Sequence, residues 1–180
     1  VCSHLWLSEM YRIQFLFSSV GFLILSLVWL APECYADDEE SGYVKIFNGK
    51  DLTGWEGNLK LWKAQEGMIV GDSPGIRHNE FLATKKKYQD FELRVEFKMH
   101  GGKGNSGIQF RTKRIPESTE VEGYQADLGE NYWGCLYDEH RRRKVLQQAS
   151  PKLAKVLKKD DWNSYWIRAQ GDHIVLKING

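Results

Sequence analysis

Cysteine, proline and net charge are all scarce in this chain of 180 residues. It contains three cysteines and four prolines, and its formal net charge is +1. Cys2 and Cys34 precede an acidic run at residues 37–40, so the region after that run holds only Cys135 and cannot form an internal disulfide. We interpret Cys135 as a packed small side chain rather than a nucleophile, because no histidine stands at a suggestive spacing from it.

Several motifs of well-known chemistry are also missing. The histidines show no zinc-binding spacing, and the chain has no phosphate-binding loop, G-x-S-x-G nucleophile turn or dinucleotide-binding glycine pattern. The near-neutral charge argues against a nucleic-acid partner, and we interpret the RRRK run at residues 141–144 as a solvated loop. Serine hydrolysis, hydride transfer and nucleic-acid binding are therefore not expected.

The N-terminal region has the pattern of a secretory signal peptide. Residues 15–31 carry no charge, Arg12 precedes them, and Cys34-Tyr35-Ala36 resembles a small-residue cleavage site. We predict a signal peptide at residues 10–36 after an upstream leader at residues 1–9, and hence export to the periplasm or the medium. The alternative is an uncleaved segment that anchors the protein in the membrane, although the apolar run is short for a span of about 20 residues.

After a linker at residues 37–42, the pattern predicts short strands separated by turns. The clearest alternation lies at residues 91–99, where five apolar residues alternate with charged ones, and similar patterns recur at residues 105–111, 123–128 and 162–169. The spacing of leucines and valine at residues 151–159 predicts one short peripheral helix. These features predict an all-β fold, an antiparallel β-sandwich of the jelly-roll type.

The chain stops at Asn179-Gly180, a dipeptide that is typical of a two-residue hairpin turn. A partner strand is expected to follow such a turn. We therefore expect residues 43–180 to be a domain that is incomplete at its C-terminus.

Four segments together resemble the 3-keto-disaccharide hydrolase family, also called domain of unknown function 1080. They are FNGKDLTGW at residues 47–55, YQDFELRVEF at 88–97, GNSGIQFR at 104–111 and GYQAD at 123–127. The resemblance implies a concanavalin A-like (LamG-type) β-sandwich in an exported bacterial protein that acts on glycosides oxidised at C3. One departure is Gly123, which stands where the family commonly has a glutamate two residues before a glutamine.

A ketone at C3 makes the C2 hydrogen acidic, so the glycosidic bond can break by elimination followed by addition of water. This route needs a base near C2, a positive or hydrogen-bonding group at the C3 oxygen and an acid near the leaving oxygen. Arg111 is the candidate for stabilising the enediolate, since a guanidinium is a fixed fork of donors. Asp127 and Glu96 are the candidate bases, or else oxygen ligands of a divalent cation.

If the strands at residues 91–99, 105–111 and 123–128 pair antiparallel, five polar residues can share one sheet face: Glu96, Gln109, Arg111, Gln125 and Asp127. Gln109 and Gln125 on that face are candidates for binding sugar hydroxyls. An aromatic and acidic segment at residues 131–140 is predicted to be a long loop that walls the site. In it, Trp133 and Tyr137 are candidate groove walls, and the candidate substrate-binding, acid or base residues are Asp138, Glu139 and His140.

Each candidate also has a structural explanation. Arg111 and Glu96 could form cross-strand ion pairs, the glutamines could be solvated, and the aromatic residues could fill the core. The rival function is a non-catalytic carbohydrate-binding or adhesive module, since this fold serves both. The enzyme hypothesis implies a 3-keto-glycoside as substrate, a separate sugar 3-oxidoreductase that makes it, and no certain cofactor.

Overall fold

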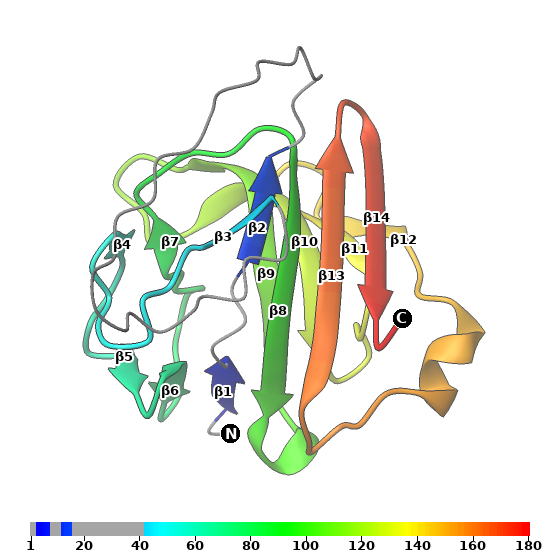
Figure 1. The fold of residues 1–180 in the computed structure, drawn as a ribbon, viewed down its shortest axis with the longest axis horizontal. Helices are drawn as coiled ribbons and strands as arrows, with labels where there is room; N and C mark the ends of the chain where they lie inside the picture. Colours follow the sequence, from blue (N-terminus) through cyan, green and yellow to red (C-terminus); the bar gives the residue numbers. More distant parts are fainter. Residues whose placement is uncertain (1–2, 8–11, 16–41) are drawn as a thin grey trace, which may run out of the picture.

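The computed structural model describes residues 3–7, 12–15 and 42–180. Its chain is built almost entirely of antiparallel strands (Figure 1). The first seven strands are β1 (Ser3–Leu7), β2 (Arg12–Phe15), β3 (Tyr43–Lys45), β4 (Trp55–Glu56), β5 (Trp62–Gln65), β6 (Met68–Ser73) and β7 (Ala83–Thr84). The next seven are β8 (Phe91–Met99), β9 (Asn105–Arg114), β10 (Val121–Gly129), β11 (Leu136–Glu139), β12 (Lys144–Gln147), β13 (Asn163–Gln170) and β14 (His173–Ile178).

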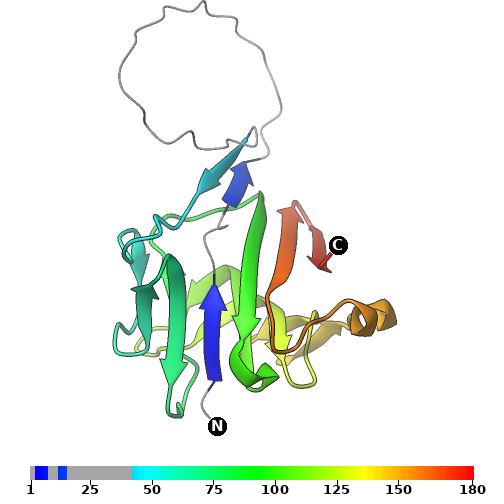
Figure 2. The same ribbon diagram turned by 60° about the horizontal axis from the view of Figure 1, so that its bottom comes forward.

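Two large sheets make up the fold, with the four-stranded sheet behind the eight-stranded one (Figures 1 and 2). The eight-stranded sheet has the order β14-β13-β8-β1-β6-β5, with β2 pairing with β8 and β3. The four-stranded sheet has the order β12-β11-β10-β9, and β4 pairs with β7 separately. All strand pairs are antiparallel, so the predicted all-β sandwich is confirmed.

The core lies between these two sheets. The alternating residues of β8 contribute its apolar face, as the sequence pattern predicted, and every second residue from Phe91 to Met99 is buried. Phe91 meets Phe110 of the four-stranded sheet edge to face at 6.0 Å between ring centroids, and Phe97 stacks on Trp133 at 6.3 Å. Burying a side chain of this size contributes about 1.5–3 kcal/mol, so the contacts between the sheets stabilise the fold.

Of two predictions of local structure, one is confirmed and one was wrong. The short peripheral helix predicted at residues 151–159 is present as a 3₁₀ helix rather than an α-helix, η2 (Pro151–Lys155), which Ser150 caps by accepting from the Lys152 amide. So few residues do not offset the cost of nucleating an α-helix. The predicted loop at residues 131–140 contains β11, which pairs with β10 and β12. A second 3₁₀ turn, η1, spans His100–Gly102.

The N-terminal predictions are mostly outside the described residues. Ser3–Leu7 and Arg12–Phe15 form strands that pair with β6 and β8, whereas residues 16–41 are not described. Cleavage after Ala36 therefore stays a prediction. Within the described part of the chain, no helix is long and apolar enough to cross a bilayer.

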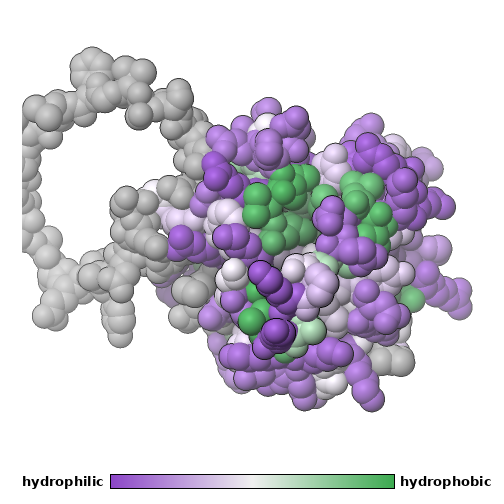
Figure 3. All heavy atoms as spheres, turned by 90° about the vertical axis from the view of Figure 1, so that its right-hand side faces the viewer, coloured by the Kyte–Doolittle hydropathy of each residue, from purple (hydrophilic) through white to green (hydrophobic). Residues whose placement is uncertain are grey.

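The side of the molecule at β14 and η2 is largely polar and carries smaller apolar patches (Figure 3). Val156, just after η2, and Val175 on β14 are among the exposed large apolar residues. Small apolar patches are ordinary on a protein surface, so these do not by themselves mark a site.

Candidate active site

A ladder of polar side chains lies on the face of the four-stranded sheet that points away from the core. Gln109 of β9 pairs with Gln125 of β10, and Gln125 pairs in turn with Tyr137 of β11. Their strand neighbours, which include Ala126 and Leu128, belong to the core cluster, so strand alternation turns the polar residues to the opposite face. We call this set the polar ladder: Gln109, Gln125, Asp127, Tyr137 and Glu139.

A close approach of β9 and β10 packs the ladder tightly. Gly107 lies opposite Asp127, and a Cβ at this glycine would come within 2.5 Å of the Gln125 side chain. The missing side chain at residue 107 is therefore what makes room for Gln125. Gln109 is equally confined: neither its amide nitrogen nor its amide oxygen has a hydrogen-bond partner among the described residues, although both are buried. Such an orphaned amide is a group that a polar ligand can satisfy.

Asp127 is the most deeply buried carboxyl of the ladder, with 3% of its surface exposed. Burial raises its pKa from 3.8 to about 7, and the charge of Glu139 acts in the same direction. A hydrogen bond from Gln125 and one from the Leu128 amide at 3.0 Å oppose this rise. The result is a carboxyl group that titrates near neutral pH.

Glu139 lies at the end of β11, opposite Gly123 of β10. Its Oε1 accepts a hydrogen bond from Gln125 Nε2 at 3.5 Å. Burial raises the pKa of Glu139 above its usual range, while the nearby His140 and Arg143 lower it and the Glu120 carboxylate raises it. Two carboxyl groups with raised pKa values thus lie on either side of one glutamine, an arrangement that is typical of functional sites.

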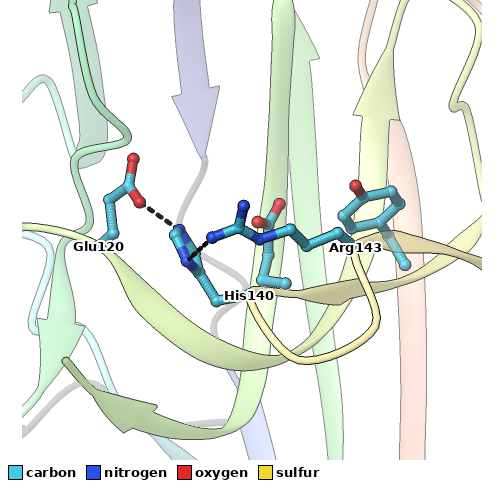
Figure 4. A pocket seen from close by; sticks show the side chains of 5 residues that line it. Glu120, His140 and Arg143 are labelled. Carbon is cyan, nitrogen blue, oxygen red and sulfur yellow. Dashed lines mark hydrogen bonds and ion pairs between the residues drawn. The ribbon is translucent and has the colours of Figure 1, made fainter.

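A polar pocket of ≈ 340 Å³ opens beside Glu139 (Figure 4). This volume is near the lower end of the roughly 300–1,000 Å³ found for small-molecule sites. The residues that line it are Glu120, Tyr137, Glu139, His140 and Arg143. Burial and the charge of Glu139 raise the pKa of Tyr137, so its hydroxyl keeps its proton at neutral pH and can donate.

Three of the lining residues form a chain of contacts across the pocket. Glu120 Oε2 and His140 Nε2 are in direct contact, and Arg143 donates to His140 Nδ1 at 3.1 Å (Figure 4). Sequence reasoning missed Glu120 and Arg143. Arg143 follows His140 closely and could have been suspected from the RRRK run, whereas Glu120, which precedes β10, gave no signal of its own.

Arg111 does not join the polar ladder. The pairing of β9 with β10 is irregular between Glu122 and Tyr124, and Arg111 has a left-handed backbone conformation with φ of 48°. This bulge interrupts the alternation that would place Arg111 beside Gln109. The guanidinium donates to the Asp90 carboxylate at 2.9 Å, to the Gln89 carbonyl at 3.2 Å and to the Gly171 carbonyl.

The structure also places three other predicted site residues away from the ladder. Glu96 belongs to β8 of the other sheet, where it lies opposite Ser164 and alternates with core residues. Trp133 is buried against Phe97 in the core. Asp138 is fully buried and binds Arg141 Nε at 2.6 Å and Arg142 at 2.8 Å.

A divalent cation has no evident set of ligands within the part of the chain that the structure describes. No group of three or more His, Cys, Asp or Glu residues there could hold a metal ion. The two predicted oxygen ligands, Asp127 and Glu96, belong to different sheets.

Comparison with known proteins gives two matches. Residues 42–180 match the model of a family described as the 3-keto-alpha-glucoside-1,2-lyase-like domain. A 3-keto-disaccharide hydrolase of Bacteroides thetaiotaomicron is 31% identical over 87 residues, which cover 43% of this chain and 30% of that protein. The chain thus spans less than a third of the length of this curated relative.

Proposed function

The chain belongs to the 3-keto-alpha-glucoside-1,2-lyase-like domain family, and from this premise we propose that it cleaves 3-keto-glycosides by elimination at C2 and C1, with net hydrolysis after water adds. The observation that carries the proposal is the position of Glu139: it lines the polar pocket, its pKa is raised, and Arg143 lines the same pocket. A base, a cation and a phenolic donor thereby surround one space.

In the first step, the Glu139 carboxylate takes the proton from C2. The electron pair of the C–H bond forms the C2–C3 double bond, and the C3 carbonyl becomes an enediolate oxygen. Arg143 is the cation that stabilises this negative charge, a role that sequence reasoning gave to Arg111. A raised pKa makes Glu139 a stronger base toward C2 than an ordinary glutamate.

In the second step, the enediolate collapses: the C3 carbonyl re-forms, the electron pair of the C2–C3 double bond forms a C1–C2 double bond, and the C1–O bond breaks with its electron pair leaving on the aglycone oxygen. The hydroxyl of Tyr137, which keeps its proton because its pKa is raised, donates to this oxygen. Water then adds across the C1–C2 double bond: its hydroxyl goes to C1 and its proton returns to Tyr137, while Glu139, whose proton exchanges with solvent, protonates C2. The sum of the two steps is hydrolysis of the glycoside.

Three other residues of the polar ladder support the pocket in this proposal: Gln109, Gln125 and Asp127. Gln109 does not line the pocket; it lies opposite Gln125 with a buried amide that has no partner among the described residues. A sugar hydroxyl can satisfy this amide only if the pocket extends along the ladder. Asp127 does not line the pocket, so it acts through charge: Glu139 raises the pKa of Asp127, and Asp127, which ionises at a pH of about 7, then adds a second negative charge close to Glu139. Asp127 is thus a tuning group rather than the base itself.

The proposal also includes the location of the protein and a partner enzyme. The uncharged stretch at residues 15–31, preceded by Arg12, supports a secreted or periplasmic location. A substrate that is already oxidised at C3 requires a separate sugar 3-oxidoreductase, because the sequence has no dinucleotide-binding pattern.

The test is turnover of a 3-keto-disaccharide in D₂O by the full-length protein. Elimination places deuterium at C2 of the product, whereas direct attack of water at C1 leaves the C2 hydrogen in place. The same assay with EDTA measures any need for a divalent cation. Tight binding without any turnover would favour a non-catalytic carbohydrate-binding module and overturn the proposal.

A further inference from the structure

Three consecutive arginines follow His140, and the structure sorts them into two groups. Arg141 and Arg142 both bind the fully buried carboxylate of Asp138, at 2.6 Å and 2.8 Å. Arg143 lines the pocket instead and contacts His140 (Figure 4). Something must therefore hold the third arginine on the pocket side, and among the described residues its side chain contacts an imidazole rather than a carboxylate.

The protonation of that imidazole decides whether it can hold Arg143. A guanidinium has donors and no acceptor, so the contact at 3.1 Å between Arg143 and Nδ1 requires Nδ1 to be the acceptor. The proton of a neutral ring must then be on Nε2. Glu120 is the group in contact with Nε2, and a carboxylate accepts the proton that this nitrogen donates.

The backbone fixes both ends of this chain of contacts. Glu120 closes the turn before β10: its carbonyl accepts from the Ile115 amide at 3.3 Å, and its amide donates to Ser118 Oγ at 3.1 Å. On the other side, the Arg143 amide donates to the Asp138 carbonyl at 2.9 Å. The side chains of Glu120 and His140 are 19% and 21% exposed, so water competes little for their contact.

We infer that Glu120 is a positioning residue of the pocket: by accepting the Nε2 proton of His140, it leaves Nδ1 as the acceptor that holds Arg143 beside Glu139. This inference rests on the proposed function for its catalytic consequence, though not for its structural content. Glu120 touches no substrate in this arrangement. It acts through His140 on the cation that stabilises the enediolate.

The direct test is the ring tautomer of His140, read from ¹⁵N NMR shifts of the ring nitrogens at mildly alkaline pH. The unmodified protein is expected to show a protonated Nε2 and an acceptor Nδ1. Glu120→Ala should give averaged shifts of both tautomers, while Glu120→Gln, which keeps an acceptor oxygen, should retain the single tautomer. Glu122→Ala is the matched control, because Glu122 pairs with the exposed Lys113 at 3.6 Å and does not line the pocket.

Turnover gives the second readout. Glu120→Ala should lower kcat by roughly 10- to 100-fold with little change in KM, since it misplaces a group that acts on the transition state, and Glu120→Gln should recover most of the rate. A Glu120→Ala protein that keeps the single Nε2-protonated tautomer would overturn the inference. If the tautomer changes as expected but the unmodified protein has no activity, the proposed function fails while the inference stands.

A second variant covers the case in which Glu120→Ala does not fold. Arg143→Ala leaves Glu120 in place, so His140 should keep its proton on Nε2. Loss of the single tautomer in Arg143→Ala would show that Arg143 orients the ring, and would overturn the inference.

Discussion

The side-chain amide of Gln125 donates to Glu139 across two neighbouring strands, at 3.5 Å, and also hydrogen-bonds to the buried Asp127. One glutamine therefore joins the base of the proposed reaction to the carboxyl group that tunes it. The contact exists because β10 and β11 pair antiparallel with Gln125 opposite Tyr137, which leaves Glu139 two residues further along the same face.

Glu139→Gln should abolish the proposed reaction while leaving the fold intact. An amide cannot take the C2 proton, and loss of a general base costs about 10²–10⁴ in rate. The measurement is kcat on a 3-keto-disaccharide, together with deuterium exchange at C2. Glu122→Gln on the adjacent strand is the matched control and should keep the full rate. Exchange at C2 that persists in Glu139→Gln would contradict the assignment of the base.

The rate should rise with pH on the acid side, because Glu139 acts in its ionised form and its pKa is raised. Asp127 has a pKa of about 7, raised in part by the charge of Glu139, so Asp127 is still protonated where Glu139 ionises. Asp127→Asn should therefore leave the acid limb of the kcat profile in place. An acid limb that moves in Asp127→Asn would show that Asp127 ionises before Glu139. Complete loss of activity would instead support Asp127 as the base.

Asp127→Asn should also stabilise the protein at alkaline pH. The pKa of Asp127 is about 7 in the folded protein against 3.8 for the free group, so the folded state binds the proton more tightly. The contribution of Asp127 to stability is therefore greatest below pH 3.8 and falls as the pH rises to about 7. Because an asparagine does not ionise, Asp127→Asn does not lose this stability as the pH rises. The loss in the unmodified protein is at most about 4 kcal/mol in the free energy of unfolding.

Urea unfolding at about pH 5 and about pH 8 measures this effect. The gain from Asp127→Asn should be larger at the higher pH. The Leu128 amide keeps an acceptor in the variant, because an asparagine retains a side-chain carbonyl oxygen. Equal gains at the two pH values would show that the raised pKa is not the cause.

Arg143→Ala should lower kcat by more than tenfold, as expected for loss of a group that stabilises developing charge. Arg142→Ala is the matched control, since Arg142 is the neighbouring arginine and binds Asp138 rather than the pocket. Its effect should appear in the free energy of unfolding and not in kcat. If the two variants have equal kcat values, Arg143 is not the stabilising cation.

Arg111→Ala should reduce stability without reducing turnover in the folded protein. It removes three contacts that tie β9 to Gln89, Asp90 and Gly171, and we expect a loss of about 1–3 kcal/mol in the free energy of unfolding. Arg114→Ala removes an exposed pair with Glu56 at 2.8 Å and should cost less than about 1 kcal/mol. A folded Arg111→Ala protein without activity would restore Arg111 as the enediolate stabiliser.

The sequence by itself determined the strands that carry the ladder. Alternation at residues 91–99 gave β8 with its buried face, and the patterns around Gln109 and Gln125 gave β9 and β10. Local periodicity is sufficient for this, because a strand that is buried on one face must repeat every two residues. The sequence also identified every residue of the polar ladder as a candidate site residue, including Asp127 and Glu139.

Only the tertiary structure decided which polar residues share a site. A bulge turns Arg111 away from the face that simple alternation assigned to it, and Glu96 belongs to the other sheet. Glu120 and Arg143 meet His140 only because a turn before β10 and a turn after β11 converge at one end of the sheet. Such contacts depend on register, bulges and sheet packing, which no short-range sequence pattern encodes.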